Sequence, residues 1–146
     1  MEERREIMEF DLKKYLGKWY EIARIKNDFE PNLRKVTAQY SFKNDGTIQV
    51  INSGYIGNKL STIEGIARKT EDNNILKVSF FPDTESYYKI LYIDKNYEYA
   101  LVGGSSNMLL WILSRTPKLE KSILDKLIGI AKEIGYNTDK VIFTEQ

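Results

Sequence analysis

The stretch GKWYEIAR, residues 17–24, determines how the rest of the chain is expected to fold. It follows an amphipathic lead, residues 10–16, whose apolar residues recur at helical spacing, and it starts an alternation of period two. Gly17 stands two residues before Trp19, which indicates backbone packed too closely for a Cβ, with an indole closing the space beside it. This arrangement is typical of the closed bottom of a β-barrel.

A second stretch, LLWILSRTP at residues 109–117, ends a predicted strand with an arginine. If Arg115 lies flat over Trp19, the cation–π contact contributes roughly 2 kcal/mol once both groups are desolvated. The first and last strands of the barrel would then be tied together at the closed end. We interpret Gly17, Trp19 and Arg115 as structural residues that do not touch ligand.

These stretches resemble the lipocalin family, through the Gly-x-Trp signature at 17–19 and the lone arginine after the last strand. Together with KVTAQY at 35–40 and KVSFF at 77–81, they are similar to the bacterial outer-membrane lipocalins and their apolipoprotein D-like relatives, over residues 10–144. The resemblance implies a barrel that holds a small hydrophobic ligand. One departure is the turn at 94–97, Asp-Lys-Asn-Tyr, where the family has Thr-Asp-Tyr. The sequence therefore does not decide how that turn packs on residues 10–16.

The composition removes several classes of function. The chain carries 22 basic and 21 acidic residues that do not segregate, which argues against a nucleic-acid partner. It has no cysteine and no histidine, so thiol nucleophiles, disulfides, imidazole bases and histidine-bound metals are excluded, and no cofactor is expected. At 146 residues one domain is expected, with residues 1–9 as a solvated tail.

The N-terminus is charged and lacks the apolar segment of a secretory signal, and no apolar run approaches the length of a transmembrane helix. The sequence as it stands therefore reads as soluble and cytoplasmic. Relatives in the outer-membrane group carry a signal peptide and a lipid-bearing cysteine, so its location stays open between removal of such a leader and a naturally unanchored protein. The resemblance also raises a homodimer, which the residues do not decide.

Eight segments with strand character follow one another at regular spacing and are joined by short turns, as an antiparallel up-and-down barrel requires. The first places Trp19, Glu21, Ala23 and Ile25 on one face and Tyr20, Ile22 and Arg24 on the other. Strands are predicted over 19–25, 36–42, 48–56, 60–69, 75–81, 87–93, 97–103 and 108–114. The fold class is therefore all-β, an eight-stranded lipocalin barrel.

Beyond the last strand, Thr116 and Pro117 read as an N-cap and a first helical residue, and apolar residues from 119 to 134 mark one face of a helix that ends at Gly135. An amphipathic helix of this kind packs on the outer wall of a barrel. Residues 141–143 predict a short strand beside the first one. In the polar loop at 27–35, Phe29 and Leu33 either form an apolar lid or tuck onto the rim.

An eight-stranded barrel encloses room for one small ligand. The predicted lining is mostly aliphatic and aromatic, with a few hydroxyls and one amide, which suits an elongated apolar molecule with one polar end. A fatty acid or lysophospholipid fits this lining, with its charged head at the mouth. The residues expected to line the wall are Ala38, Tyr40, Val50, Asn52, Val78, Phe80, Tyr88, Ile90, Tyr92, Leu109, Trp111 and Leu113.

Alternatives remain at this point. The inward face of the strands between 48 and 93 is not decided by alternation, because the face under the C-terminal helix is apolar too. The inner row of side chains can also fill its own interior, which would leave an interaction module. An enzyme acting on a lipid-like substrate would have to use inward carboxylates such as Glu21 or Glu64, which have no nucleophile and base pair beside them.

Overall fold

The structure is a computed structural model, and it describes residues 10–25 and 33–146. All eight predicted barrel strands, the C-terminal helix and the terminal strand are present, in the predicted order. The elements are α2 (Leu12–Tyr15), β1 (Gly17–Ile25), β2 (Arg34–Phe42), β3 (Ile48–Ile56), β4 (Lys59–Lys69), β5 (Ile75–Ser79), β6 (Ser86–Ile93), β7 (Tyr99–Gly103), β8 (Leu110–Ser114), α3 (Lys121–Ile134), the 3₁₀ turn η1 (Thr138–Lys140) and β9 (Val141–Phe143).

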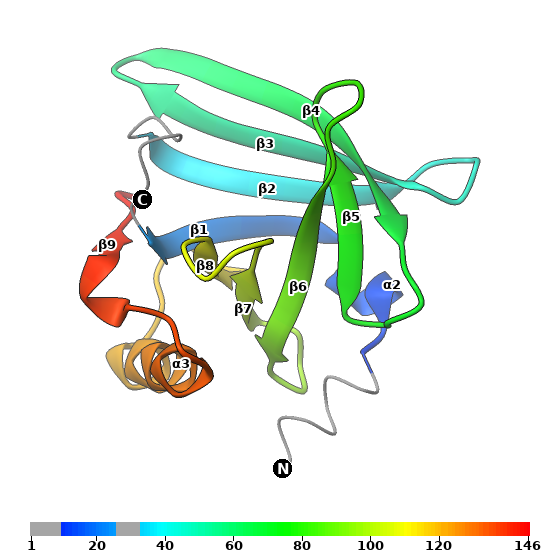
Figure 1. The fold of residues 1–146 in the computed structure, drawn as a ribbon. Coiled ribbons are helices and arrows are strands. Elements are labelled where there is room, and N and C mark those ends of the chain that lie inside the picture. The colour runs from blue at the N-terminus through cyan, green and yellow to red at the C-terminus, as the bar shows by residue number, and fades with distance from the viewer. Residues whose placement is uncertain (1–9, 26–32) are drawn as a thin grey trace.

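The sheet closes on itself through β1. Its strand order is β2-β3-β4-β5-β6-β7-β8-β1-β9, every pairing is antiparallel, and β1 also pairs with β2, which makes an eight-stranded barrel with β9 as an extra strand (Figure 1). Along one edge, β1 pairs first with β2 over residues 17–20 and then with β9 over residues 23–25. The predicted pairing of the terminal strand with the first strand is therefore confirmed.

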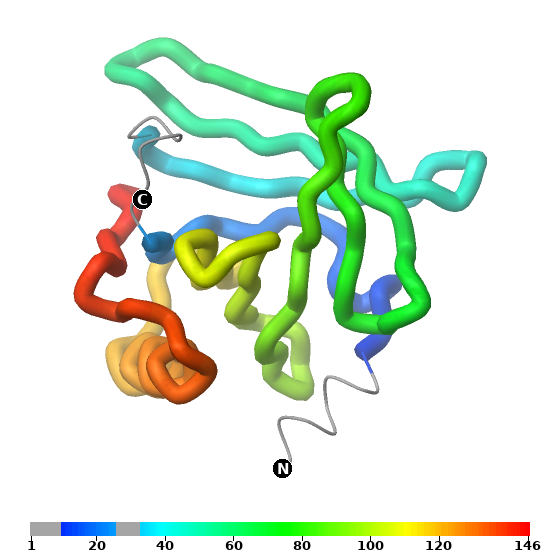
Figure 2. Tube along the Cα trace, viewed as in Figure 1, coloured from blue at the N-terminus to red at the C-terminus, as the bar shows by residue number. Residues whose placement is uncertain are grey.

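The seam between β1 and β2 is completed by the residues after β9, which run alongside the end of β1 and the start of β2 (Figure 2). Gln146 Nε2 donates to the backbone oxygens of Glu21 at 2.7 Å and of Val36 at 2.8 Å. The Lys35 N–H donates to the Glu145 carbonyl at 2.6 Å. Residues 144–146 thus bridge the two strands where their own pairing has stopped.

Helix α3 lies on the outer wall, as predicted, but it begins later than expected. Thr116 is not its N-cap, because the Thr116 hydroxyl donates to the Lys118 carbonyl at 2.8 Å within the preceding turn, and the helix begins at Lys121. It ends as predicted at Gly135, whose φ of 120° suits glycine. The buried Leu127 and Ala131 pack against the outer faces of β1, β6, β7 and β8.

Two strands depart from simple alternation beneath this helix. The register of β1 against β8 shifts between Glu21 and Ala23, and that of β6 against β7 shifts between Ile90 and Tyr92. At each β-bulge two consecutive side chains, one of them Ile22 in β1, point outward into the cluster under α3. Beyond the bulge, the inward and outward faces are exchanged relative to the sequence prediction.

The closed end of the barrel is built as predicted around Trp19 and Arg115. The Arg115 Cζ lies 3.8 Å from the centroid of the Trp19 ring, and the indole is fully buried. The guanidinium also donates to the carbonyls of Lys14, Tyr15, Lys18 and Tyr97 at 2.9 to 3.1 Å. One cation therefore joins the lead, the first strand, the turn before β7 and the end of β8.

Gly17 is required for a reason that differs in part from the expected one. Its φ is 103°, a conformation that L side chains rarely adopt, and an added Cβ would lie 3.3 Å from Arg115 Nη1. The close neighbour is thus the guanidinium, while Trp19 Nε1 donates to the Tyr15 carbonyl at 2.8 Å. Gly17 is the residue at which the backbone turns from α2 into β1.

The turn at 94–97 still packs on the N-terminal lead, although it departs from the family signature. The Tyr97 ring stacks on Phe10 with centroids 5.8 Å apart, and its hydroxyl accepts the Asp11 N–H at 2.8 Å. Asp94 is buried, and its Oδ1 accepts the N–H groups of Glu98 at 2.6 Å and Tyr99 at 2.9 Å. The Asp94 carboxylate therefore stabilises this turn, whose packing the sequence did not decide.

Candidate functional site

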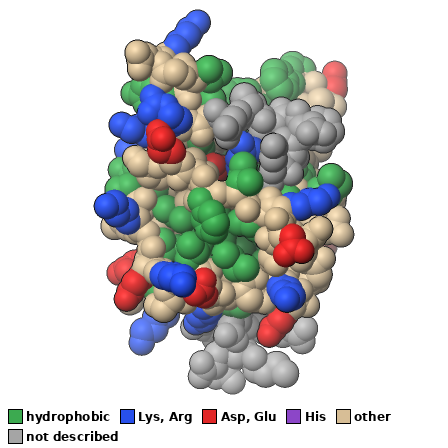
Figure 3. Space-filling view, turned by 90° about the vertical axis from the view of Figure 1, so that its left-hand side faces the viewer, with side chains coloured by type: hydrophobic (Ala, Val, Ile, Leu, Met, Phe, Trp, Pro, Cys, Tyr) green, Lys and Arg blue, Asp and Glu red, His purple; other side chains and the backbone are tan. Residues whose placement is uncertain are grey.

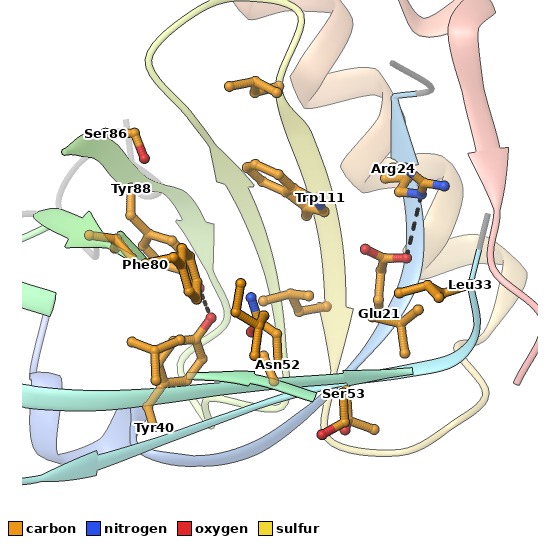
Figure 4. A pocket seen from close by; sticks show the side chains of 18 of the residues that line it. Glu21, Arg24, Leu33, Tyr40, Asn52, Ser53, Phe80, Ser86, Tyr88 and Trp111 are labelled. Carbon is orange, nitrogen blue, oxygen red and sulfur yellow. Dashed lines mark hydrogen bonds and ion pairs between the residues drawn. The ribbon is translucent and has the colours of Figure 1, made fainter. Parts of the chain in front are cut away.

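A cavity of about 480 Å³ lies inside the barrel (Figure 4), and neither Trp19 nor Arg115 of the closed end is part of its wall. Its volume falls within the range of ligand sites in proteins, roughly 300 to 1,000 Å³. Side chains from β1, β2, β3, β4, β5, β6 and β8 and from neighbouring loops form its wall. They are Glu21, Arg24, Leu33, Val36, Thr37, Ala38, Tyr40, Val50, Asn52, Ser53, Ser61, Ile63, Val78, Phe80, Ser86, Tyr87, Tyr88, Leu109, Trp111 and Leu113.

Every predicted lining residue except Ile90 and Tyr92 reaches this cavity. Alternation placed the members from β2, β3, β5 and β8 correctly because those stretches keep a continuous pleat. The structure therefore brings the predicted residues together around one space. Whether each of them contacts a ligand stays a prediction.

Tyr92 was predicted to face inward, and this is wrong. It lies beyond the bulge of β6, so its ring stacks on Tyr99 outside the barrel and its hydroxyl accepts a hydrogen bond from Lys126 Nζ at 2.9 Å. Ile90 does point inward, but it is fully buried in the core cluster that also contains Trp19. Neither residue is part of the cavity wall.

Much of the cavity wall is apolar. Val50, Val78, Phe80 and Leu113 contribute to it, and Figure 4 shows Phe80 beside Tyr88 on one side and Trp111 between the two sides. The Phe80 ring lies directly against the backbone of Gly65, where an added Cβ would come within 2.6 Å of Phe80 Cδ1. Gly65 thus provides the room that keeps this ring back against the wall.

A cluster of three tyrosines lies toward the inner side of the cavity. The Tyr40 hydroxyl donates to Tyr88 at 2.9 Å, and Tyr88 shares a further hydrogen bond with Tyr15 beneath it. Burial raises the pKa of Tyr40 to about 12, against a smaller lowering by its hydrogen bond to Tyr88, and burial likewise raises the pKa of Tyr15 and of Tyr88. The three groups therefore stay neutral at physiological pH.

The three tyrosine hydroxyls have one more donor proton than the hydrogen bonds within the cluster use. Three hydroxyls carry three protons, and the described structure shows two hydrogen bonds among them. Where Tyr15 donates to Tyr88, the O–H left over is that of Tyr88, which lines the cavity. Where Tyr88 donates, it is that of Tyr15, which is fully buried and outside the cavity wall. The Asn52 carboxamide lines the same cavity, and no hydrogen bond to it is found among the described residues.

The wall also holds an ion pair that alternation did not place there. Glu21 and Arg24 both line the cavity, with Arg24 Nε 3.8 Å from Glu21 Oε2 and both side chains less than a tenth exposed. The sequence prediction assigned Arg24 to the opposite face, and the bulge of β1 at Ile22 is the reason that it turns inward. Two adjacent apolar residues, Ile22 and Ala23, were the available signal of that bulge.

The open end of the barrel carries exposed hydrophobic side chains at the ends of strands and hairpins. Those more than about two fifths exposed include Ile56, Leu60, Tyr87 and Met108. Figure 3, which faces the side where the β3–β4 hairpin ends, shows hydrophobic side chains in the middle of that face with charged ones around them. Leu33 lines the cavity, while Phe29, its predicted partner in a lid, lies outside the described residues.

Candidate catalytic and metal groups are sparse. Glu64 was expected to be an inward carboxylate, and this is wrong, because it is exposed and alternates with the inward Ile63. In residues 10–25 and 33–146, no three acidic side chains are grouped so as to hold a metal ion. Within the same residues, no helix has the length and apolar character needed to cross a membrane.

A closed eight-stranded barrel with a mostly apolar cavity, plugged at one end and open toward the other, defines the class of proteins that bind one small hydrophobic ligand. Comparison with known proteins agrees, because a family profile described as "Lipocalin-like domain" matches residues 10–146. The chain belongs to the lipocalin family. Membership implies that it binds a small hydrophobic ligand.

Relatives over nearly the whole chain support this assignment. The chain is 43% identical over 145 residues to outer membrane lipoprotein Blc of Vibrio cholerae, covering 96% of this chain and 85% of the relative. It is 41% identical to Blc of Escherichia coli K12, with 94% and 80% covered, and 33% identical to mouse apolipoprotein D, with 94% and 77% covered. Lobster apocrustacyanin A1 shares the fold with a TM-score of 0.80 at 20% identity, covering 98% and 85%.

Proposed function

We propose that this protein binds a fatty acid or a lysophospholipid in the barrel cavity, to store or transport it, without catalysing a reaction on it. The observation that carries the proposal is the cavity itself, a space of about 480 Å³ that the protein's own side chains leave open. An interaction module with a filled barrel would not need this space. The apolar side chains of the wall suit an acyl chain, and its polar groups suit a head group.

The energetics of such a ligand are favourable. Burying a sixteen-carbon chain gains on the order of 0.8 kcal/mol for each CH₂ group, and binding costs several kcal/mol in lost freedom and chain ordering. The balance leaves room for dissociation constants in the micromolar range or below. The exposed apolar residues at the open end offer a surface along which such a chain enters.

The absence of catalysis is supported by the chemistry of the wall. Glu21 is engaged with Arg24 and with the Thr144 hydroxyl, which donates to Glu21 Oε2 at 2.6 Å. The phenols of the tyrosine cluster keep their protons at physiological pH, so they are poor general bases. Nothing in the described wall combines a nucleophile with a base that activates it.

Native mass spectrometry of the freshly purified protein tests the proposal, because a co-purified lipid appears as an adduct of defined mass. A titration with a cis-unsaturated fatty acid, followed by tryptophan emission, tests it quantitatively. We expect Ala38→Leu, which adds volume inside the cavity, to weaken binding about tenfold or more. Gln39→Leu, on the exposed face of the same strand, is the matched control and should bind like the wild type.

An unliganded spectrum together with emission that does not change at saturating fatty acid and lysophospholipid would overturn the proposal. Equal affinity of the Ala38→Leu variant and the wild type would remove the cavity as the site. Turnover of the ligand, seen as a change in its mass during incubation, would contradict the non-catalytic part.

A further inference from the structure

The feature that calls for an explanation beyond apolar binding is the tyrosine cluster at the inner side of the cavity. Tyr15, Tyr40 and Tyr88 come from α2, β2 and β6, which lie far apart in the sequence, and their hydroxyls are hydrogen-bonded to one another. Tyr15 also belongs to the closed end, since its ring lies 4.9 Å from that of Trp19 and its carbonyl accepts from Arg115 at 3.1 Å. The cluster therefore joins the cavity wall to the closed end of the barrel.

The three members of the cluster differ in their surroundings. Tyr15 is fully buried and outside the cavity wall, whereas Tyr40 and Tyr88 both line the cavity. Tyr88 is the least buried of the three. Because a buried O–H group without an acceptor is costly, the protons of the cluster are expected to lie where each of them finds one.

This requirement decides the direction of the hydrogen bonds. The Tyr40 hydroxyl donates to Tyr88 at 2.9 Å, and the bond between Tyr15 and Tyr88 allows either donor. If Tyr88 donated, the Tyr15 proton would be left in the interior, where no second partner of its hydroxyl is found among the described residues. If Tyr15 donates, the proton left over is that of Tyr88, at the cavity wall, where water or a ligand can accept it. The second arrangement is therefore the stable one.

In this arrangement the Tyr88 hydroxyl acts toward the cavity only as a donor. Its oxygen already accepts two hydrogen bonds, and burial raises the pKa of Tyr88 well above its ordinary value, so the group keeps its proton. An apolar chain that displaces water from Tyr88 leaves this O–H unpaired, whereas an oxygen acceptor on the ligand satisfies it. The Asn52 carboxamide in the same wall offers both a donor and an acceptor, so it does not distinguish ligands in this way.

We propose that the Tyr88 hydroxyl donates a hydrogen bond to the bound ligand and selects acyl chains that carry a carbonyl oxygen in the half distant from the head group. The inference rests on the proposed function, since it requires the acyl chain to occupy the cavity with its charged head at the mouth. A chain in this orientation extends inward toward the cluster. The oxygen that reaches Tyr88 is then one in its far half.

Positional isomers of one ligand test the inference, because they share the same length, the same charge and nearly the same cost of leaving water. Calorimetric titration compares oxooctadecanoates that carry the ketone at the fifth, tenth, twelfth or sixteenth carbon. The wild-type protein should bind the best of the three isomers with a distant ketone about tenfold or more tighter than the isomer with the ketone at the fifth carbon. Octadecanoate itself measures binding of the chain without a ketone, and so separates failure of the inference from failure of the proposed function.

Tyr88→Phe removes the donor and should bring the four isomers to within about threefold of one another, while octadecanoate still binds. The matched control is Tyr92→Phe, the same change on the same strand, at a hydroxyl that lies outside the barrel and accepts from Lys126 Nζ at 2.9 Å. The control should keep the wild-type preference.

Infrared spectroscopy of the best isomer, labelled with carbon-13 at the ketone, adds a readout that packing alone would not move. In the wild-type complex the C=O stretch should lie below its frequency in a hydrocarbon solvent, because the oxygen accepts a hydrogen bond. In Tyr88→Phe the frequency should return toward the hydrocarbon value.

Four results would overturn the inference while leaving the proposed function standing: equal binding of all isomers by the wild type, tightest binding of the isomer with the ketone at the fifth carbon, an unchanged preference in Tyr88→Phe, or a C=O stretch in the wild-type complex as high as in hydrocarbon. Should Tyr88→Phe fail to fold, because two buried hydroxyls lose their acceptor, the wild-type titrations and the infrared frequency decide by themselves. Binding of neither octadecanoate nor any isomer would instead contradict the proposed function for fatty acids, and the inference with it.

Discussion

Replacing Arg115 by methionine should destabilise the protein by about 4 kcal/mol. The guanidinium donates to four backbone carbonyls and lies 3.8 Å above the Trp19 centroid. Counting about 0.5 to 1 kcal/mol for each hydrogen bond, because the group is only half-buried, and about 1 kcal/mol for the cation–π contact gives a loss of roughly 3 to 5 kcal/mol. Domains of this kind have a total stability of about 5 to 15 kcal/mol.

Urea unfolding followed by tryptophan emission measures this loss. With a slope of about 2 kcal/mol per molar urea, the midpoint should fall by about 2 M. Arg115→Lys should lie between the variant and the wild type, because one ammonium cannot reach all four carbonyls. The matched control is Arg68→Met, an exposed arginine 3.9 Å from Glu85, which should cost less than about 0.5 kcal/mol.

The reasoning is refuted if Arg115→Met loses no more stability than Arg68→Met. A smaller dependence of the unfolding free energy on urea concentration, with an unchanged midpoint, would instead indicate a change in the unfolded state. The comparison of midpoints would then carry no information about the closed end. Emission of the folded variant serves as the check that Trp19 is still buried before urea is added.

Three further predictions concern single positions. Gly17→Ala should cost about 1 to 2 kcal/mol, measured by the same urea titration, because it forces a side chain into positive φ beside Arg115. Stability should be nearly constant up to about pH 10 and then fall toward pH 12, because the folded tyrosines keep protons that the unfolded chain has lost. Tyr40 contributes about 2 kcal/mol of this fall and Tyr15 and Tyr88 add to it, so Tyr40→Phe should reduce the fall without abolishing it. Gly65→Ala should push Phe80 toward the cavity and weaken fatty-acid binding about tenfold. It should also lower the stability in the same urea titration, because the added Cβ would lie 2.8 Å from the Ser79 backbone oxygen, and circular dichroism checks that the variant is folded when binding is measured.

Much of the barrel could be predicted because its determinants are local. Period-two alternation, short turns and the Gly-x-Trp signature are each read from a few neighbouring residues. The contact between Trp19 and Arg115 is not local, and the resemblance to a known fold was enough to predict it. The inward faces of β2, β3 and β8 followed from the same alternation. Where the pleat is continuous, parity propagates along the strand without error.

The bulges could not be predicted in this way, and they account for the errors at the site. An extra residue at Ile22 turns Arg24 inward, and one at Leu91 turns Tyr92 outward. Both bulges lie where two consecutive apolar residues face α3, and that face is defined by a helix a hundred residues away in the first case and about thirty in the second. The polarity of the cavity was underestimated for this reason.

The three strands that pair with β1, namely β2, β8 and β9, determine how fast the protein folds. β2 follows closely along the chain, but β8 and β9 come from the far end, so the loops that must close before these pairings form are long and costly in entropy. Refolding should accordingly be slow for a chain of this size. Until the late partners arrive, the unpaired edges of β1 are available to neighbouring molecules, so yields should decline as protein concentration rises.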